Sequence, residues 1–334
     1  VLCDAGTVTF SDSTVGSEPI TDYTWDFGDG NSSSQQNPTH YYNSPGSYDV
    51  TLTVTTQSGC SVRLVKPMGV RVIARPDIAI VGDSTACIYD SIRHTGVFIQ
   101  PDTSVVTWQW IFPNGSSSTI QNPPAQTYQP GSYTIFAYAT NSDGCIDTAT
   151  KNITVYPLPT VSMPGQMTIA VGFSDTIPAS YSNGVNQWNW TPPYALSCLD
   201  CPRPVATPKS TTTYQVAFSD INGCRNTGSI EVVVICKDAN FYIPNTFSPN
   251  GDGSNDRFYP RGRGLYLIRS MRVFNRWGET VFENRSFQAN DANAGWDGRY
   301  KGNRAQPDVY VYQVEIQCDN GEMIKLTGNI ALIL

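Results

Sequence analysis

Charged and acid–base side chains are scarce in this sequence. Only 15% of the 334 residues are Asp, Glu, Lys or Arg, and His occurs only as His40 and His94. The sequence contains no G-x-S-x-G, H-E-x-x-H or Walker motif, the patterns typical of hydrolases, metalloproteases and nucleotide-binding enzymes. A glycosidase would also need a cleft to hold paired carboxylates, which nothing in the sequence indicates. We therefore expect these residues to have no enzymatic activity.

Long apolar runs are missing as well. No stretch approaches the roughly 20 apolar residues of a transmembrane helix. The opening residues Val1-Leu-Cys-Asp4 have neither the basic nor the apolar part of a signal peptide. We expect either a mature product or a piece of a longer protein, and we favour the piece because the sequence opens within a strand pattern.

The charge is unevenly distributed between two parts of the chain. Residues 236–334 contain 12 basic and 11 acidic residues, which gives a net charge of +1. The whole chain has a net charge of −7, so residues 1–235 have a net charge of −8. An acidic surface repels nucleic acid and favours solubility. The sequence therefore indicates no nucleic-acid partner.

Turn-forming residues and tyrosine are abundant. The chain contains 27 Gly, 23 Pro and 18 Tyr among alternating β-branched residues, which favours short strands joined by tight turns. A chain of this length also exceeds what one hydrophobic core usually serves. We predict an all-β protein of several domains.

Tryptophan, tyrosine and cysteine recur at fixed spacing. Trp25 is followed by Tyr48 and Cys60 after 23 and 35 residues, and Trp110 is followed by Tyr133 and Cys145 at the same two distances. A third copy has Trp190, Tyr214 and Cys224. Each Tyr opens an alternating apolar and polar run, which predicts a half-buried antiparallel strand.

The first repeat resembles the polycystic-kidney-disease (PKD) domain. The resemblance rests on Trp25-Asp-Phe-Gly-Asp-Gly30, on Asn37-Pro-Thr-His-Tyr41 and on Pro45-Gly-Ser-Tyr-Asp-Val-Thr-Leu-Thr-Val54. The second repeat keeps Trp110-Ile-Phe-Pro-Asn-Gly115 without the aspartates, and the third is only PKD-like. The resemblance implies immunoglobulin-like sandwiches. We place these domains at residues 1–75, 76–157 and 158–235.

Residues 236–334 resemble a different family. They contain in order Ile243-Pro-Asn-Thr-Phe-Ser-Pro-Asn-Gly-Asp-Gly253, Phe274-Asn-Arg-Trp-Gly278, Trp296-Asp-Gly298 and Asp308-Val-Tyr-Val-Tyr312. This order is similar to the gliding-motility-associated C-terminal domain, the type B sorting domain of the type IX secretion system. The resemblance implies a small antiparallel sandwich that is recognised by the type IX translocon and held by an outer-membrane barrel of the PorP/SprF-like kind.

The nine cysteines indicate disulfides and an oxidising compartment. Similar separations within the first two repeats predict the pairs Cys3–Cys60 and Cys87–Cys145. The Pro-rich surroundings of Cys198-Leu-Asp-Cys201 favour a local structural disulfide over a redox site. Cys236 and Cys318 are then the predicted pair of the last domain, and Cys224 is the predicted odd thiol.

Two acidic loops have two interpretations each. Asn250, Asp252, Asn255 and Asp256 offer hard oxygens for Ca²⁺, although their spacing is not that of an EF-hand. A network of Asx turns is the alternative, and we favour it. Asp26 and Asp29 pose the same choice between calcium ligands and turn caps. No cofactor is required by either interpretation, with calcium as the one candidate.

The terminal domain also contains candidate partner-binding residues. Its arginines are either solvated residues of strands and loops or a docking patch for an acidic groove. They are Arg257, Arg261, Arg263, Arg269, Arg272 and Arg276. The last strand, which includes residues 330–334, offers an edge for β-augmentation, so Leu332 and Leu334 join this set. We expect most aromatic residues of the same segment, Tyr259, Tyr266, Phe274, Trp277 and Phe282, to be core residues.

Five short Asp-Ser/Thr tripeptides resemble the O-glycosylation acceptor of Bacteroidota. The acceptor side chains would be Ser13, Ser84, Ser91, Thr148 and Thr176.

Taken together, the sequence predicts an extended rod of tandem sandwiches, because its Pro-marked linkers are short and stiff. We expect a secreted surface adhesin similar to the mobile gliding adhesins, attached to the outer membrane. One alternative is a fragment of a secreted polysaccharide- or protein-degrading enzyme. Another is a module that binds surface glycans through Trp108, Trp188 or Trp190.

Overall fold

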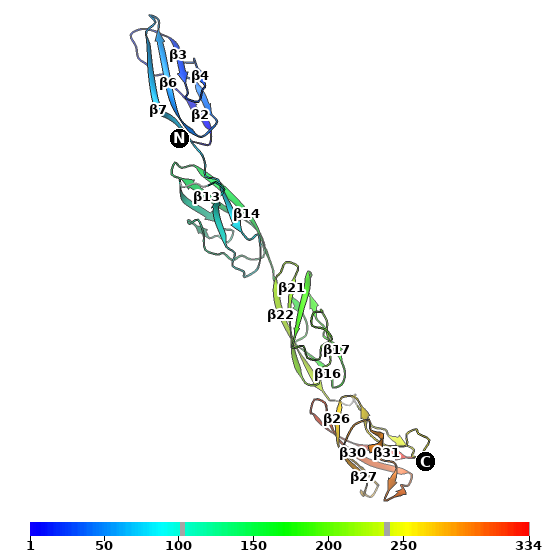
Figure 1. Cartoon of the computed structure of the whole chain (residues 1–334). Helices are drawn as coiled ribbons and strands as arrows, with labels where there is room; N and C mark the ends of the chain where they lie inside the picture. The colour runs from blue at the N-terminus through cyan, green and yellow to red at the C-terminus, as the bar shows by residue number, and fades with distance from the viewer. Residues whose placement is uncertain (101–103, 237–240, 334) are drawn as a thin grey trace. The chain divides into compact units, whose positions relative to one another are not determined.

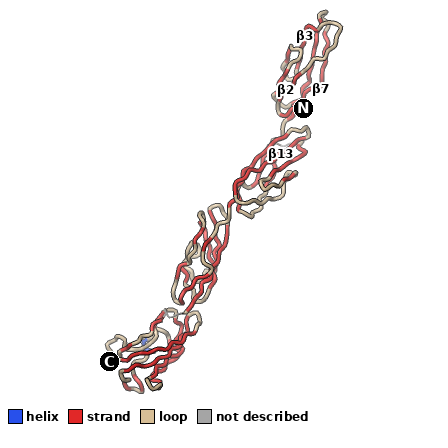
Figure 2. The backbone as a smooth tube through the Cα atoms, turned by 180° about the vertical axis from the view of Figure 1, so that it is seen from behind, coloured by secondary structure: helices blue, strands red, loops and turns tan. Residues whose placement is uncertain are grey.

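We describe the protein from a computed structural model, covering residues 1–100, 104–236 and 241–333. They fall into two compact units, Val1–Pro157 and Leu158–Leu334. Strands and loops form nearly all of each unit, as Figure 2 shows, and the helical segment among the described residues is the short 3-10 turn η2 (Ala292–Ala294). The predicted all-β fold class is confirmed.

The first sandwich has a larger sheet with the strand order β1-β7-β6-β3-β4 and a small sheet that pairs β2 with β5. Strands β6 (Gly46–Thr56) and β7 (Ser61–Ile73) form a long hairpin. Strand β3 (Ile20–Asp26) lies antiparallel to β6 (Figure 1). Strand β1 (Leu2–Cys3) lies parallel to β7. The other strands are β2 (Gly6–Thr9), β4 (Ser32–Ser33) and β5 (Thr39–Tyr42).

The second sandwich repeats this arrangement. Its larger sheet has the order β12-β11-β13-β14-β9, and β8 pairs with β10. The hairpin is formed by β13 (Gly131–Asn141) and β14 (Ile146–Tyr156), with β9 (Thr85–Cys87) parallel to β14. The other strands are β8 (Ile78–Gly82), β10 (His94–Phe98), β11 (Val105–Ile111) and β12 (Ser117–Ser118).

The third sandwich has a four-stranded sheet of order β16-β22-β21-β19. Strands β21 (Thr212–Asp220) and β22 (Arg225–Ile235) form its hairpin, and β16 (Gln166–Ala170) lies parallel to β22. The other strands are β15 (Val161–Ser162), β17 (Asp175–Thr176), β18 (Ser180–Tyr181), β19 (Val185–Thr191) and β20 (Val205–Ala206).

The terminal domain has the same central arrangement, with the strand order β24-β31-β30-β26-β27. Its hairpin joins β30 (Asp308–Cys318) to β31 (Met323–Leu332), and β24 (Thr246–Phe247) lies parallel to β31. The other strands are β23 (Phe241–Tyr242), β25 (Arg261–Gly262), β26 (Leu265–Phe274), β27 (Thr280–Phe287), β28 (Arg299–Tyr300) and β29 (Asn303–Arg304). All four domains are thus built around a long hairpin with a short parallel strand on its outer side.

A buried tryptophan anchors the core of each repeat. The side chains of Trp25, Trp110 and Trp190 are buried, and each indole Nε1–H donates to a backbone carbonyl, of Gln36, Ile120 and Cys201 respectively. An indole is stable in a core when its N–H finds an acceptor. The alternating residues of the predicted strands also face inward, as Val50, Leu52 and Val54 do.

In the first, second and terminal domains, a tyrosine near the start of the hairpin fixes the preceding turn. The hydroxyls of Tyr48, Tyr133 and Tyr310 donate to the carbonyl oxygens of Ser44, Gln129 and Gln306, at 2.8, 3.0 and 2.8 Å. This contact resembles the tyrosine corner of immunoglobulin-like sandwiches. The terminal domain therefore shares a local device with the first two repeats.

The disulfides differ from the predicted pairs in the first two repeats. Cys3 bonds Cys145, and neither the Cys3–Cys60 nor the Cys87–Cys145 pair forms. Cys3 lies beside Ile73 because β1 runs parallel to the far end of β7. The 13 residues of β7 separate that end from Cys60 by about 40 Å, whereas disulfide Cα atoms lie within about 7 Å.

The same parallel pairing excludes Cys87–Cys145, because Cys87 lies beside Tyr156 at the opposite end of β14 from Cys145. The structure does form Cys198–Cys201 and Cys236–Cys318, as the sequence predicted. Cys87 and Cys224 are also disulfide-bonded, so Cys224 is not the odd thiol. The free cysteine is Cys60, which is exposed.

His94 generates a prediction about pH. Its side chain is 3% exposed, and neither ring nitrogen has a hydrogen-bond partner among the described residues. Burial, and then the charge of Lys151, lower the pKa of His94 below its usual value, against the opposing effect of Asp83. As the pH falls below about 6.5, the unfolded chain takes up a proton that the folded domain does not.

The free energy of unfolding of the second sandwich should therefore be lower at pH 5 than at pH 7. Replacing His94 by Leu should remove this part of the pH dependence. Urea denaturation of both proteins at the two pH values measures it. An identical pH dependence in the H94L variant would contradict the assignment.

Candidate functional site: the closing hairpins and the terminal domain

In each domain, the two strands of the long hairpin are joined by a tight turn of the same geometry, and we call this turn the closing hairpin. The closing hairpins are residues 56–60, 141–145, 220–224 and 318–322. In each, the first N–H donates to the fifth carbonyl, at 2.9, 3.0, 3.1 and 2.9 Å respectively. The fourth residue is a glycine with φ between +84° and +88°. Only glycine adopts this conformation without strain, so the turn is fixed by sequence.

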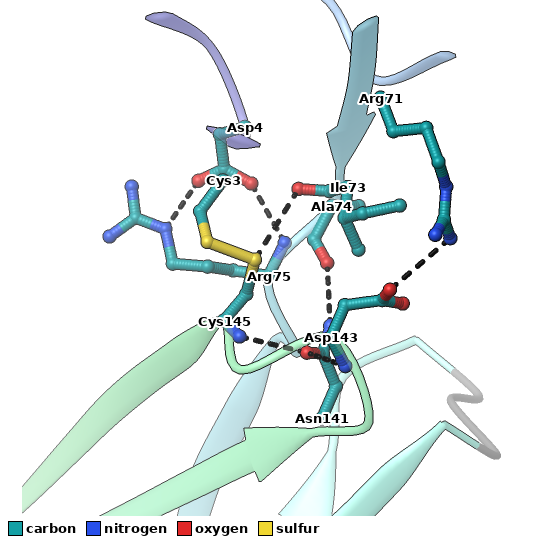
Figure 3. The surroundings of a disulfide bond; sticks show 9 residues. All are labelled: Cys3, Asp4, Arg71, Ile73, Ala74, Arg75, Asn141, Asp143 and Cys145. Atoms are coloured by element: carbon teal, nitrogen blue, oxygen red, sulfur yellow. Dashed lines mark hydrogen bonds and ion pairs between the residues drawn. A yellow bond between two sulfur atoms is a disulfide. The ribbon is translucent and has the colours of Figure 1, made fainter. Parts of the chain in front are cut away.

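Within the first unit, closing hairpin 141–145 docks on the first sandwich (Figure 3). Cys145 bonds Cys3. The Asn141 side chain, which is buried, donates to the Ala74 carbonyl at 3.2 Å. Its Oδ1 accepts from the backbone N–H groups of Asp143 and Cys145, at 3.2 and 2.9 Å. One side chain thus shapes the turn and holds the preceding sandwich.

Two ion pairs flank this joint (Figure 3). Arg71 of β7 donates to Asp143 of the hairpin at 3.2 Å, which links the two sandwiches. Arg75 donates to Asp4 through its backbone N–H at 2.8 Å and also through its guanidinium group. The backbone N–H and then the side chain of Arg75 lower the pKa of Asp4. Both carboxylates are therefore already partnered at the joint.

Within the second unit, closing hairpin 318–322 docks on the third sandwich in a related way. Cys318 bonds Cys236, just after β22. Glu322 accepts from the Cys236 backbone N–H at 2.8 Å, and Asn320 donates to the Val234 carbonyl at 3.2 Å. The side-chain amide of Asn320 and then the Cys236 N–H lower the pKa of Glu322. The hairpin therefore binds the preceding backbone through the side chains of Asn320 and Glu322.

Two glycines allow close backbone approach at this second joint. A Cβ atom at Gly172 would lie 2.6 Å from the Gly264 nitrogen, and one at Gly264 would lie 2.4 Å from the Val171 carbonyl oxygen. Both residues also have positive φ angles. Val171, Val234 and the two cysteines form a small apolar cluster beside them.

The terminal domain has its own surface feature at Trp277, which is 85% exposed. The turn that carries it is held by Asn275, whose Oδ1 accepts from the N–H groups of Trp277 and Glu279, both at 3.0 Å. Trp277 borders a hollow of about 580 Å³, whose other lining residues include Arg276, Tyr300, Lys301, Arg304 and Asp308. This surface joins an exposed indole to polar and mostly cationic groups.

Sequence reasoning missed this surface because it assigned most aromatic residues of the segment to the core. Tyr266, like Trp277, is exposed, at 56%. The signal was present in the sequence, since Trp277-Gly278 lies in a turn outside any alternating pattern.

The predicted arginine patch is distributed over several parts of the domain, and most of its members have partners there. Arg272 donates to Glu283 at 3.0 Å, Arg276 pairs with Asp308, and Arg269 donates to Gln317 at 2.9 Å. Arg261 lies over the Tyr259 ring at 4.5 Å, Arg257 donates to the Gly295 carbonyl at 3.4 Å, and Arg263 is exposed beside the joint glycine Gly264. Of the set, Arg276 lines the hollow beside Trp277.

The side chain of Leu332 is not available to a partner, contrary to the sequence prediction. It is 2% exposed, and its strand pairs with Phe247 of β24 on the outer side. Leu334 lies outside the described residues.

The Asn-Gly-Asp-Gly loop forms a network of Asx turns. Asp256 accepts from the N–H groups of Gly251 and Gly253, at 2.6 and 2.8 Å, and Asp252 accepts from Ser254 at 2.7 Å. The Asn250 side chain donates to Asp252 at 2.9 Å, and Asn255 has φ of +51°. These contacts support the Asx-turn interpretation, and calcium binding stays an untested prediction.

Asp26 and Asp29 also cap their turn. Asp26 accepts from the N–H of Gly28 and Asp29 from that of Asn31, both at 3.0 Å. His40 lies 2.7 Å from the second oxygen of Asp29 and stacks on Phe27. Burial opposes ionisation of Asp29, but the contacts with His40 and Asn31 lower its pKa. Among the described residues, no group of three His, Cys, Asp or Glu side chains is placed to hold a metal ion.

The tryptophans proposed for carbohydrate binding belong to cores. Trp108 and Trp190 are buried, and Trp188 packs against Tyr181 and Phe218 in the core of the third sandwich. The five predicted glycosylation residues are all exposed: Ser13, Ser84, Ser91, Thr148 and Thr176.

Comparison with known families identifies the first, second and terminal domains. Residues 2–72 and 73–155 each match the PKD domain, and residues 241–332 match the CHU_C Type IX secretion signal domain. The chain carries PKD repeats followed by a type IX secretion signal domain. None of these domains is catalytic, and the secretion signal domain is that of a secreted, surface-associated protein.

Individual relatives match less completely. A microbial collagenase of Vibrio alginolyticus is 48% identical over 54 residues, which are 16% of this chain and 7% of the collagenase. Among solved structures, the chain is similar to a tetra-tandem repeat from the extending region of a large adhesion protein. The match includes 99% of this chain and 96% of the other, at 12% identity and a TM-score of 0.37. The human desmocollin-1 ectodomain covers 97% and 76%, at 11% identity and a TM-score of 0.26.

Among the described residues, no helix is long and apolar enough to cross a membrane.

The first joint gives a prediction for Asn141. Replacing Asn141 by Ala removes the acceptor of two backbone N–H groups and the donor to Ala74 in a buried position. We expect the free energy of unfolding to fall by about 1–3 kcal/mol. Urea denaturation of the whole chain measures the loss. The matched control is Ser142→Ala, one residue further and exposed, and an equal effect of both variants would contradict the role of Asn141.

Proposed function

We propose that this protein is part of a secreted cell-surface adhesin similar to the mobile gliding adhesins. In this proposal, residues 1–235 act as a stalk, and residues 241–332 direct the protein to the type IX translocon. The observation that carries the proposal is the combination of PKD repeats with a type IX secretion signal domain in one chain. The protein would remain attached to the outer membrane and need no cofactor, with calcium an optional ligand of the Asn250–Asp256 loop.

The stalk role is supported by how the sandwiches of one unit are joined. A disulfide, a buried amide and an ion pair connect the first two sandwiches. Such contacts resist separation better than a flexible linker does, because several groups must lose their partners at once. A stalk that presents an adhesive segment away from the cell needs this property.

We also propose that the terminal domain docks on an outer-membrane barrel of the PorP/SprF-like kind through the hollow beside Trp277. Exposed Trp and Arg residues are the side chains that most often dominate binding at protein interfaces. Arg276 and Lys301 of this surface are paired with Asp308 and Glu279. Trp277 and Arg304 offer an exposed indole and a further cation. They fit a partner surface that combines an apolar pocket with acidic side chains.

The proposal also includes O-glycosylation of the protein itself. The exposed positions of Ser13, Ser84, Ser91, Thr148 and Thr176 leave their hydroxyls accessible, so all five are proposed O-glycosylation sites.

A second candidate function is that of a stalk in a secreted degradative enzyme. The 54-residue match to a microbial collagenase favours it. In that case the catalytic domain would lie elsewhere in the protein, and the same secretion signal would apply. The sequence of the complete gene distinguishes the two, because the enzyme alternative requires a recognisable catalytic domain.

The secretion role is tested by export from the source organism. Deleting residues 241–332 should leave the protein inside the cell envelope, since the translocon would have no signal to recognise. Trp277→Ala should leave export intact but release more protein into the medium, because docking alone is weakened. Fractionation with immunoblotting measures both, and Tyr266→Ala is the exposed aromatic control.

Normal surface display of the deletion variant would refute the secretion role. Unchanged retention of the Trp277→Ala variant, or equal release of the Tyr266→Ala control, would refute the docking surface only.

A further inference from the structure

Closing hairpin 56–60 matches the docked hairpins in geometry but has no disulfide. The Thr56 N–H donates to the Cys60 carbonyl at 2.9 Å, and the Gly59 N–H donates to the Thr56 carbonyl at 2.9 Å. Hairpin 141–145 has the same two hydrogen bonds, at 3.0 and 3.1 Å. Cys60 and Cys145 therefore occupy the same position, the fifth of the turn.

This fifth position forms a disulfide in the other two repeats. Cys145 bonds Cys3, and Cys224, the fifth residue of hairpin 220–224, is also disulfide-bonded. Cys60 is free and exposed. The equivalent cysteines of the second and third repeats each have a disulfide partner, whereas Cys60 has none. Disulfides are expected to form in an oxidising compartment.

The partner of Cys145 shows what kind of cysteine fits this position. Cys3 lies on β1, the short strand parallel to the last strand of the preceding sandwich. Its neighbour Ile73 ends that last strand, so the cysteine faces the next domain. A matching partner for Cys60 is therefore a cysteine on the first, parallel strand of another sandwich.

We propose that Cys60 forms an interdomain disulfide with the first-strand cysteine of a β-sandwich that precedes residue 1 in the full-length protein. The present chain supplies no such cysteine, because Cys60 is the one free thiol and the other eight cysteines are disulfide-bonded. A second copy of this chain offers only its own Cys60.

The charge near the hairpin completes the proposed joint. At the docked hairpin, Asp143 pairs with Arg71 of the preceding sandwich. Near Cys60, the carboxylate is Glu18, which accepts from the Ser58 hydroxyl at 2.6 Å. That hydrogen bond lowers the pKa of Glu18. The partner sandwich should therefore present a basic side chain beside its cysteine.

The bond forms by thiol–disulfide exchange with an oxidised protein dithiol carrier of the cell envelope. The Cys60 thiolate attacks the disulfide of the carrier, and one carrier sulfur leaves as a thiolate. The thiolate of the partner cysteine then attacks the Cys60 sulfur of this mixed disulfide and releases the second carrier sulfur. Two electrons and the two thiol protons thus pass to the carrier, which ends as a dithiol.

Disulfide mapping of the natively secreted full-length protein tests the proposal. Free thiols are blocked with N-ethylmaleimide in denaturant, and the protein is cleaved before Asp residues without reduction. Residues 49–76 then form one peptide in which Cys60 is the one cysteine. We expect this peptide to be unlabelled and linked to a peptide whose sequence lies outside residues 1–334.

Labelled Cys60, a 49–76 dimer, or a link to any peptide from residues 1–334 would overturn the proposal. In the Cys60→Ser variant, the partner cysteine should become labelled while the Cys3–Cys145 pair, as internal control, stays unlabelled. This proposal and the secretion role fail separately, because the mapping reads the bonding state of Cys60 and not the amount of protein that is exported.

Discussion

The structure depends on one tight turn, repeated at the end of the long hairpin of every domain. A left-handed glycine and a hydrogen bond across the turn fix the position of the fifth residue. In the two joints described, a cysteine of this turn bonds the preceding sandwich, and its polar side chains bind the backbone of that sandwich. Since the turn is rigid, the contact it makes is rigid too.

Each sandwich can use this turn because its own core is independent. The indole N–H groups of Trp25, Trp110 and Trp190, and that of Trp296 in the terminal domain, find acceptors within their own domains. The hairpin strands therefore remain in place without help from the next domain. The joints then add contacts, and at the second joint a small apolar cluster, to cores that form within each domain, which suits a chain in which domains are added in series.

The sequence predicted the features that depend on local pattern. Alternation identified the hairpin strands, and the spacing of Trp25 and Tyr48 identified the repeats and their cores. The predicted disulfide partner of Cys3 was wrong, because equal spacing of cysteines in the sequence does not reveal which end of a sandwich the parallel first strand lies at. The prediction that the arginines form one patch was wrong for a similar reason. Arg272 and Arg276 pair with acidic residues of neighbouring strands, and their proximity cannot be read from the sequence. Trp277 was wrongly predicted to be a core residue, because its exposure depends on its place in a turn and not on its residue type.

The central claim is that a closing hairpin holds the backbone of the preceding sandwich, and hydrogen exchange at Cys236 tests it most directly. The Cys236 N–H donates to Glu322, which is 86 residues away in the next domain. In a Glu322→Ala variant, the Cys236 amide should exchange faster than in the unmodified protein. A Glu315→Ala control, which loses contacts with Lys325 and Ser270 inside the terminal domain, should leave it unchanged. Equal protection of Cys236 in all three proteins would contradict the account.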